Sequence, residues 1–177
     1  QNPVKATGYG GRQRRVTGDQ FDFFSIEYVY DGGLRTHAAA RQINGCTNGK
    51  VQQINGTKGY ADAAGKLYDL DGNEIWAYPY PEEGDETSEW NVTNPFVQEH
   101  INLVTAIRTG KPVNDAEAQV NSTLLTIMGR IAAYTGKDIT WEEIMNSDLY
   151  LGPKTYAFGP VPEVKEQVPK AGVENKA

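Results

Sequence analysis

Arginine side chains near the N-terminus form the most chemically suggestive group in the sequence. Arg12, Arg14 and Arg15 follow a pair of glycines at positions 10 and 11. A guanidinium presents N–H donors in a planar fork, which suits an anionic or polyhydroxylated ligand. Glycine lets backbone N–H groups approach a ligand closely. We therefore interpret Gly11 and Arg12 as candidate ligand-binding residues, against the alternative that the arginines are solvated loop charges.

A second candidate group lies at the end of a predicted strand, where Arg41 precedes Gln42, and a further candidate is His100. His100 lies beside Glu99 on a predicted helix, where a packed or solvated role competes with a functional one. The sequence contains no pair of histidines four residues apart and no G-x-S-x-G or G-x-x-x-x-G-K-S/T motif. We therefore assign no catalytic, cofactor-binding or metal-binding residue to this chain.

The composition is that of a globular, acidic chain. Its 177 residues, 38% hydrophobic and 23% charged, suit one domain with a core of its own. A net charge of −6 argues against nonspecific nucleic-acid binding, and no apolar run is long enough to span a membrane. Cys46 is the only cysteine, so the compartment, cytoplasm or periplasm, stays open. The start at Gln1 indicates a piece of a longer protein.

The glycines at positions 8, 10 and 11 do not match a dinucleotide-binding fingerprint. That motif needs an apolar strand before the glycines, a third glycine and a helix after them. Residues 1–7 do not have the pattern of a strand, and Gln13 occupies the position of the third glycine.

A predicted sheet in the first half of the chain must position the candidate residues. Residues 21–30 alternate as a strand does, with an apolar face formed by Phe24, Ile26, Tyr28 and Tyr30. The sequence Asp-Gly-Gly at 31–33 predicts a hairpin turn, and 34–41 returns.

The length of that hairpin loop decides which side chains share a face. A two-residue loop would place Arg35, His37 and Arg41 on the face of Tyr28 and Tyr30, whereas a three-residue loop would reverse this. We favour the mixed tyrosine, arginine and histidine face, which suits a subunit interface or the floor of a ligand site.

The remaining strands are predicted at 51–54, around 60, and at 67–70 and 75–78, where the last two flank the turn Asp-Gly-Asn. Asp69, Asp71 and Glu74 faintly resemble a calcium loop, but turn chemistry explains them better. Residues 80–93 form an acidic connection that carries Trp90.

Two consecutive helices follow. Asn94 caps the first, with proline at its first position, and Thr109 and Gly110 end it. Asn114 or Asp115 caps the second, which has an apolar stripe from Val120 to Ile131 that we expect to face the core. An opposite stripe of small residues, including Gly129, predicts close approach by another element.

The order of elements, strands first and helices afterwards, predicts an α+β fold with a mainly antiparallel, open-faced β-sheet and helices packed on one face. A capping box opens a short helix at Thr140. We assign residues 1–157 to this domain and residues 158–177, which contain proline and glycine, to an extended tail.

Four stretches, in this order and spacing, carry a resemblance to a known family: GYGGRQ, then DGG…ARQINGC, then INGTKG, then NPFVQEHINLVTAIRTGKPVNDAEAQVNSTLLTIMGRIAAYTGKDITW. Over roughly residues 3–150 the chain is similar to the C-terminal domain of Gfo/Idh/MocA oxidoreductases. Members join a Rossmann domain that binds NAD or NADP to an α+β domain. That second domain supplies part of the substrate pocket, and its open sheet face commonly builds a dimer or tetramer.

The resemblance implies a domain that is inactive by itself. The family's glycine fingerprint, Glu-Lys-Pro motif and catalytic histidine helix precede the region that matches, and this sequence contains none of them. By position, Gly11 and Arg12 would line the substrate pocket, with Arg41, Gln42 and His100 as further candidates.

The function expected from the resemblance is substrate binding and homo-oligomerisation in an NAD(P)-dependent oxidoreductase that acts on a sugar or cyclitol. Two alternatives remain: a domain of an NAD-dependent glycosidase of the same family, and a non-catalytic assembly or sugar-binding module. No nucleic-acid or membrane partner is expected.

Overall fold

The structure, a computed structural model, describes residues 1–79, 94–160 and 168–173. In these ranges the chain forms one antiparallel sheet of eight strands in the order β7-β6-β5-β4-β3-β2-β1-β8. The strands are β1 (Lys5–Gly11), β2 (Phe23–Val29), β3 (Arg35–Arg41), β4 (Gly49–Gly56), β5 (Gly59–Asp62), β6 (Lys66–Tyr68), β7 (Glu74–Ala77) and β8 (Ile139–Thr140). The first seven form a meander, and β8 returns after the helices to pair with β1. The predicted α+β fold with a mainly antiparallel sheet is confirmed.

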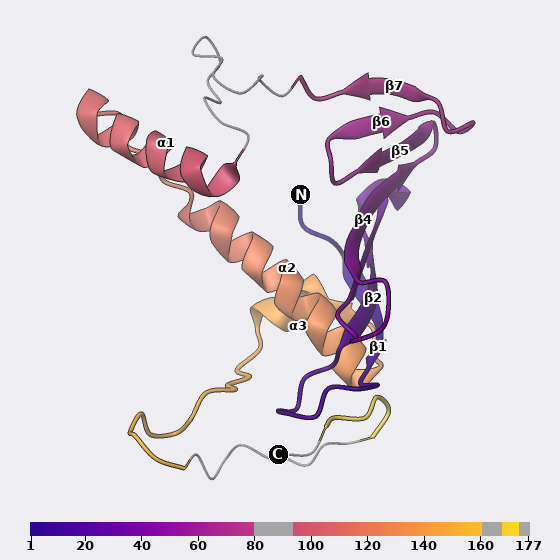
Figure 1. The fold of residues 1–177 in the computed structure, drawn as a ribbon, viewed down its shortest axis with the longest axis vertical. Helices are drawn as coiled ribbons and strands as arrows, with labels where there is room; N and C mark the ends of the chain where they lie inside the picture. Colours follow the sequence, from indigo (N-terminus) through magenta and orange to yellow (C-terminus); the bar gives the residue numbers. More distant parts are fainter. Residues whose placement is uncertain (80–93, 161–167, 174–177) are drawn as a thin grey trace.

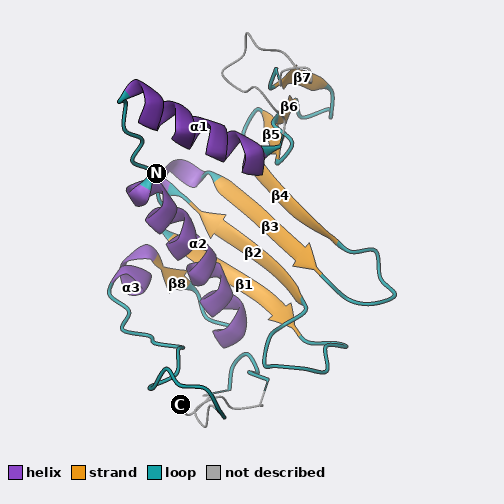
Figure 2. Cartoon of the chain, turned by 60° about the vertical axis from the view of Figure 1, so that its left-hand side comes forward, coloured by secondary structure: helices purple, strands orange, loops and turns teal. Residues whose placement is uncertain are grey.

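Three helices accompany the sheet: α1 (Pro95–Thr109), α2 (Ala116–Thr135) and α3 (Trp141–Met145). The termini of α1 and α3 match the predicted capping, whereas the N-cap residue Asp115 of α2 makes no side-chain capping hydrogen bond. The Asn94 side chain accepts from the backbone N–H of Phe96, and Gly110 ends α1 in the left-handed conformation. At α3 the Thr140 and Glu143 side chains complete a capping box. Figure 2 shows α2 lying across the face of β1 and β2.

The contact between α2 and the sheet depends on two glycines. A Cβ added to Gly8 on β1 would lie 2.4 Å from the backbone nitrogen of Ala133, and one added to Gly129 would lie 2.2 Å from the Tyr28 hydroxyl. The close approach predicted for the small-residue stripe is therefore confirmed at Gly129 and Ala133. The apolar stripe is less buried than expected, because Val120 at its N-terminal end is 55% exposed.

Tyr28 illustrates how tightly this interface is closed. Its hydroxyl donates to the backbone oxygen of Leu125 at 3.0 Å, beside Gly129. Burial raises the pKa of Tyr28 to about 12, so the hydroxyl keeps the proton that it donates. The buried cluster around it consists of Ala6, Ile26, Met128, Ala132, Ala133 and Ile144.

The interpretation of residues 1–7 as unlike a strand is wrong. Residues 5–11 form β1, which pairs with both β2 and β8 and lies against α2. Glycine weakens the strand pattern of these residues. At position 8 it is required by packing, because a side chain there would enter the backbone of α2. The exclusion of a dinucleotide-binding loop stands, since these glycines belong to an antiparallel strand.

The favoured mixed face of the β2–β3 hairpin is also wrong. Residues 31–33 form a three-residue loop, and the backbone N–H of Tyr30 donates to the oxygen of Leu34 at 2.9 Å. The register therefore pairs Tyr28 with Thr36 and Glu27 with His37. The tyrosines face α2, whereas Arg35 and His37 share the opposite face of the sheet.

Helix α1 projects away from the sheet beyond the start of α2 (Figure 1). Phe96, Leu103 and Ile107 on this helix are 74%, 57% and 72% exposed, whereas Gln98 is buried. The apolar residues of α1 have the predicted helical spacing. Most of their side chains are nevertheless exposed to solvent in the described part of the structure.

The outer strands follow the predicted turns. Asp69 accepts from the backbone N–H groups of Asp71 and Asn73 at 2.9 and 2.8 Å, so its carboxylate closes the turn between β6 and β7. The predicted connection at 80–93, with Trp90, lies outside the described residues.

Within the predicted tail, residues 168–173 return to α2, where the N–H of Gly172 donates to the oxygen of Thr135 at 2.9 Å.

Candidate functional site

The predicted residues Arg41 and Gln42 lie together in a hollow of about 530 Å³ at the end of the sheet where β2 begins and β3 ends. Its lining includes Arg15, Phe21, Phe24, Arg41, Gln42 and Lys50, and we call it the basic hollow. This volume falls within the range of small-molecule sites.

Gly11 and Arg12 lie in a smaller neighbouring hollow of about 330 Å³, together with Lys170 and Ala171 from the C-terminal segment. Phe21 lines both hollows. Four of the five predicted residues thus lie around one end of the sheet.

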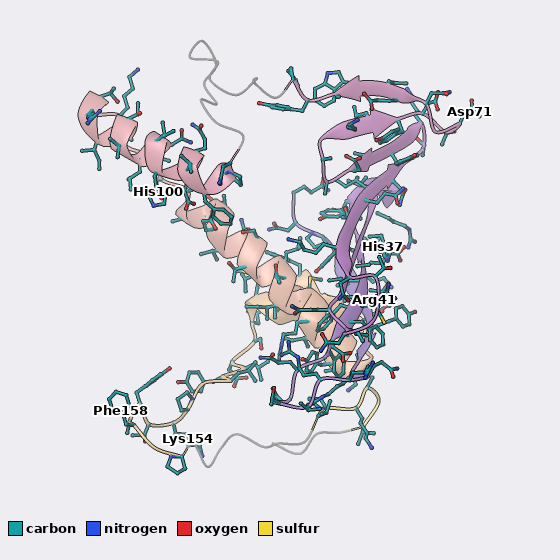
Figure 3. All side chains as sticks on the ribbon, viewed as in Figure 1. His37, Arg41, Asp71, His100, Lys154 and Phe158 are labelled. Carbon is teal, nitrogen blue, oxygen red and sulfur yellow. The ribbon has the colours of Figure 1, made fainter. Side chains whose placement is uncertain are left out.

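His100 does not belong to this site. It projects from α1, where its side chain is 76% exposed, and its Nδ1 lies 2.7 Å from the backbone oxygen of Phe96 and 3.7 Å from Glu99 Oε1. Figure 3 shows His100 on the projecting helix and Arg41 at the sheet, well separated.

The loop that carries the arginines is shaped by the buried carboxylate of Asp22. Asp22 Oδ2 accepts from the backbone N–H groups of Gln13, Arg14 and Arg15 at 3.0, 2.9 and 3.1 Å. These hydrogen bonds, that from Arg14 foremost, lower the pKa of Asp22 from its usual value of 3.8, so the carboxylate stays ionised. The three N–H donors occupy it, and it is therefore a structural anchor.

Helix α2 holds Phe21, the aromatic residue that lines both hollows, in place. The ring of Tyr134 stacks on Phe21 with centroids 4.0 Å apart, and its hydroxyl accepts from the backbone N–H of Phe21 at 2.9 Å. The guanidinium of Arg130 lies 4.3 Å from the Tyr134 centroid on a cation–π contact. The packing of α2 against the sheet thus extends to Phe21, which lines the basic hollow.

The arginines at this end of the sheet bind neutral oxygen atoms. Arg12 donates to the backbone oxygens of Arg15 and, at 2.5 Å, of Gly18, which holds its own loop. Arg15 donates to Gln20 Oε1 at 2.6 Å, and Arg41 donates to the backbone oxygen of Thr47. Within the described ranges, ion pairs involve only Lys5, Arg35, Lys66 and His100.

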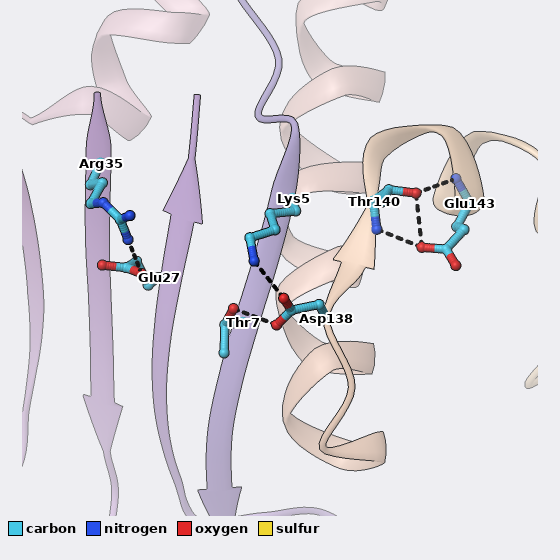
Figure 4. A network of polar contacts seen from close by, with 7 residues as sticks. All are labelled: Lys5, Thr7, Glu27, Arg35, Asp138, Thr140 and Glu143. Carbon is cyan, nitrogen blue, oxygen red and sulfur yellow. Dashed lines mark hydrogen bonds and ion pairs between the residues drawn. The ribbon is translucent and has the colours of Figure 1, made fainter. Parts of the chain in front are cut away.

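The sheet face opposite α2, which we call the open face, is polar. It carries Tyr9, Ser25, Glu27, Arg35 and His37 by strand register. Ser25 Oγ lies 2.9 Å from His37 Nε2, and Arg35 donates to Glu27 at 2.6 Å. Figure 4 shows the Glu27–Arg35 pair together with Asp138, which binds Lys5 and Thr7. None of the described helices covers this face (Figures 1 and 2).

Sequence reasoning missed Phe21, Asp22 and Lys50 as parts of the site. Lys50 lies opposite Ala40 because β4 begins at Gly49, two residues before the predicted start. A predicted strand that began at Gly49 would have placed Lys50 beside the end of β3. No local signal marks Asp22, since its partners lie seven to nine residues earlier in the chain.

The glycine stretch at residues 8–11 does not form the loop that binds a dinucleotide pyrophosphate. It lies inside antiparallel β1, with Gly8 pressed against α2, instead of forming a loop before a helix. The residues that the structure describes contain no group of three or more His, Cys, Asp or Glu side chains that could hold a metal ion. None of the described helices has the length and hydropathy needed to span a bilayer.

Comparison of the chain with models of protein families, with curated proteins and with solved structures gave no match. The function proposed below therefore depends on the residues of the site and on the resemblance of the sequence stretches given above.

Proposed function

We propose that this chain is the substrate-binding and oligomerisation domain of an NAD(P)-dependent oxidoreductase that acts on a sugar or cyclitol. The observation that carries the proposal is the basic hollow, where Arg41 and Gln42 from the end of β3 meet the arginine loop at residues 12–22. The antiparallel sheet with one open face is the architecture that the resemblance implies, and so it supports the same proposal.

The chemistry of the hollow suits recognition of hydroxyl groups. The guanidinium of Arg41 and the amide of Gln42 offer several donors, and the Gln42 amide oxygen accepts as well. The half-buried ring of Phe24 supplies apolar surface on which the C–H face of a sugar ring can lie, and the buried ring of Phe21 lies beside it with centroids 5.9 Å apart. The role of these side chains is to bind and orient; the hydride acceptor would be supplied by a cofactor domain outside residues 1–177.

A non-catalytic sugar-binding module is the second candidate, favoured by one observation. Among the described residues, Asp22 is the only carboxylate that lines the basic hollow, and three backbone N–H groups donate to it. The described part of the hollow therefore lacks a free general base.

Turnover by the full-length protein tests the proposal. Formation of NADH or NADPH should be followed with a panel of aldoses and cyclitols, in the parent protein and in the Gln42→Leu variant, which loses the amide of the hollow. We expect reduction of the nucleotide with at least one substrate and a raised KM in the variant. Sugar binding by calorimetry without nucleotide reduction would replace the oxidoreductase with the binding module. Release of free sugar from a glycoside, dependent on NAD but without net NADH, would instead identify the glycosidase.

The open face is the proposed homo-oligomer interface. Tyr9, on β1 toward one edge of this face, is 68% exposed, and the Arg35–Glu27 and Ser25–His37 pairs satisfy polar groups of the face within one chain. Sedimentation over a range of concentrations should show a dimer or tetramer that Tyr9→Glu shifts to monomer, because a buried unpaired charge is costly at an interface. A parent protein that sediments as a monomer at all concentrations contradicts this part of the proposal.

A further inference from the structure

We propose that the basic hollow selects a sugar that carries a negative charge, a carboxylate or a phosphate group, over its neutral counterpart. This inference rests on the proposed sugar-binding function and adds the class of the ligand. It follows from three observations on the described residues: the positive charge of the hollow, the absence of ion pairs between its cations and a carboxylate, and the hydrogen bonds that occupy Asp22.

Positive charge is concentrated at this end of an acidic molecule. The two segments that build it, residues 12–22 and 41–50, contain five arginine and lysine side chains against two carboxylates, a local charge of +3. The chain as a whole carries a net charge of −6. Such a local reversal of sign raises the concentration of anionic ligands at the site and disfavours its use by cations.

Three cationic side chains line the hollow itself: Arg15, Arg41 and Lys50. No carboxylate within the described ranges forms an ion pair with any of them. Arg15 and Arg41 use part of their donor set on a glutamine side chain and a backbone oxygen, and each guanidinium retains further N–H groups. The Lys50 side chain is exposed and makes no hydrogen bond or ion pair within the same ranges.

The negative charge of Asp22 does not neutralise these cations by direct contact. Its carboxylate accepts the backbone N–H groups of residues 13–15, which lie on the loop side of the hollow. An ordinary surface cluster of cations would pair with nearby acidic groups in an acidic protein. Here the cations line a hollow of about 530 Å³ that also has two phenylalanine rings in its lining, which is room for a hexose bearing one charged substituent.

Binding of three matched hexoses to the full-length protein tests the inference. Glucose, glucuronate and glucose 6-phosphate share one ring and differ in charge, and inorganic phosphate serves as a fourth probe. By isothermal titration calorimetry we expect at least one charged hexose to bind about tenfold more tightly than glucose, because charge-assisted hydrogen bonds are stronger than neutral ones. The preference between glucuronate and glucose 6-phosphate distinguishes a carboxylate from a phosphate ligand.

Substitution of Lys50 tests the location. Lys50→Gln should weaken the charged hexose about tenfold and affect glucose far less, because glutamine keeps a hydrogen-bond donor at this position but loses the charge. Lys58→Gln, which makes the same change on the β4–β5 turn at the opposite end of the strand, is the matched control and should have no effect. Raising the ionic strength to about 0.5 M should reduce the preference.

Equal affinity for glucose and both charged hexoses would overturn the inference while sugar binding stands. Absence of binding by every hexose would remove the proposed function together with it. Inorganic phosphate that binds as tightly as glucose 6-phosphate would overturn the claim that the hollow recognises a sugar, and equal effects of Lys50→Gln and Lys58→Gln would overturn its location.

Discussion

Replacement of Gly8 by alanine tests the packing that supports the site. The added Cβ would lie 2.4 Å from the backbone nitrogen of Ala133 and 2.9 Å from the backbone carbon of Ala132. Ordinary contact with a backbone atom begins near 3.4 Å, so α2 would have to recede from β1 by about 1 Å. Both neighbours are backbone atoms of buried residues in the last turn of α2, and no side-chain rotation relieves the clash.

The magnitude follows from two opposing contributions. Overpacking of a closed interface costs about 1–3 kcal/mol, and a gap of about 0.5–1 Å elsewhere along α2 forfeits a quarter to a half of each dispersion contact. The lower entropy of the unfolded chain returns about 0.4–1 kcal/mol when alanine replaces glycine. We therefore expect Gly8→Ala to lower the free energy of unfolding by about 2 kcal/mol, which moves a urea midpoint by about 1 M.

Gly49 at the start of β4 provides the matched control. It is also a strand glycine, but a Cβ added there meets no atom within 4 Å, and its φ is not positive. Gly49→Ala should be neutral or slightly stabilising in the same urea titration. Stabilities of the two variants within about 0.5 kcal/mol of each other would refute the inference that α2 and β1 are in backbone contact at Gly8.

Three further predictions concern the anchors of the site and of the domain. Tyr134→Phe should cost about 1–3 kcal/mol in urea unfolding, because it leaves the buried N–H of Phe21 without an acceptor; an unchanged midpoint would contradict this. Thr140→Ala should cost about 0.5–2 kcal/mol through loss of the α3 cap, and Thr140→Ser should retain most of the stability. The lowered pKa of Asp22 stabilises the fold above its ordinary value of 3.8, and this stabilisation is lost as the pH falls through the lowered pKa. Melting temperatures measured between about pH 2 and 5 should therefore fall less steeply in Asp22→Asn than in the parent, whereas parallel curves would show that the carboxylate is not an acid-sensitive anchor.

The elements with local signals were predicted from the sequence. Asn94 and Gly110 bound α1, and Thr140 with Glu143 opens α3, because capping depends on side chains within a few residues of the helix end. The two hairpins around residues 31–33 and 71–73 were also predicted, since antiparallel strands joined by tight loops pair with each other.

Features set by contacts between distant segments were not predictable in this way. Strand β1 lacks the composition of a strand, because α2, more than a hundred residues later, requires glycine at position 8. The face on which Arg35 and His37 lie depends on one residue of loop length, and the pattern alone allowed both outcomes. The basic hollow could be predicted only in part. Arg41 and Gln42 are candidates by sequence alone, whereas Lys50 lies near them only because β3 pairs with β4.

Hydrogen–deuterium exchange of the full-length protein, with and without a saturating sugar ligand, is the most direct test that this end of the sheet is a binding site. Binding in the basic hollow predicts slower exchange in residues 12–22 and 41–50, with α1 and the β6–β7 turn unchanged. Protection confined to the open face or to α1, or no protection by any sugar that binds, would place the ligand elsewhere and contradict the proposed site.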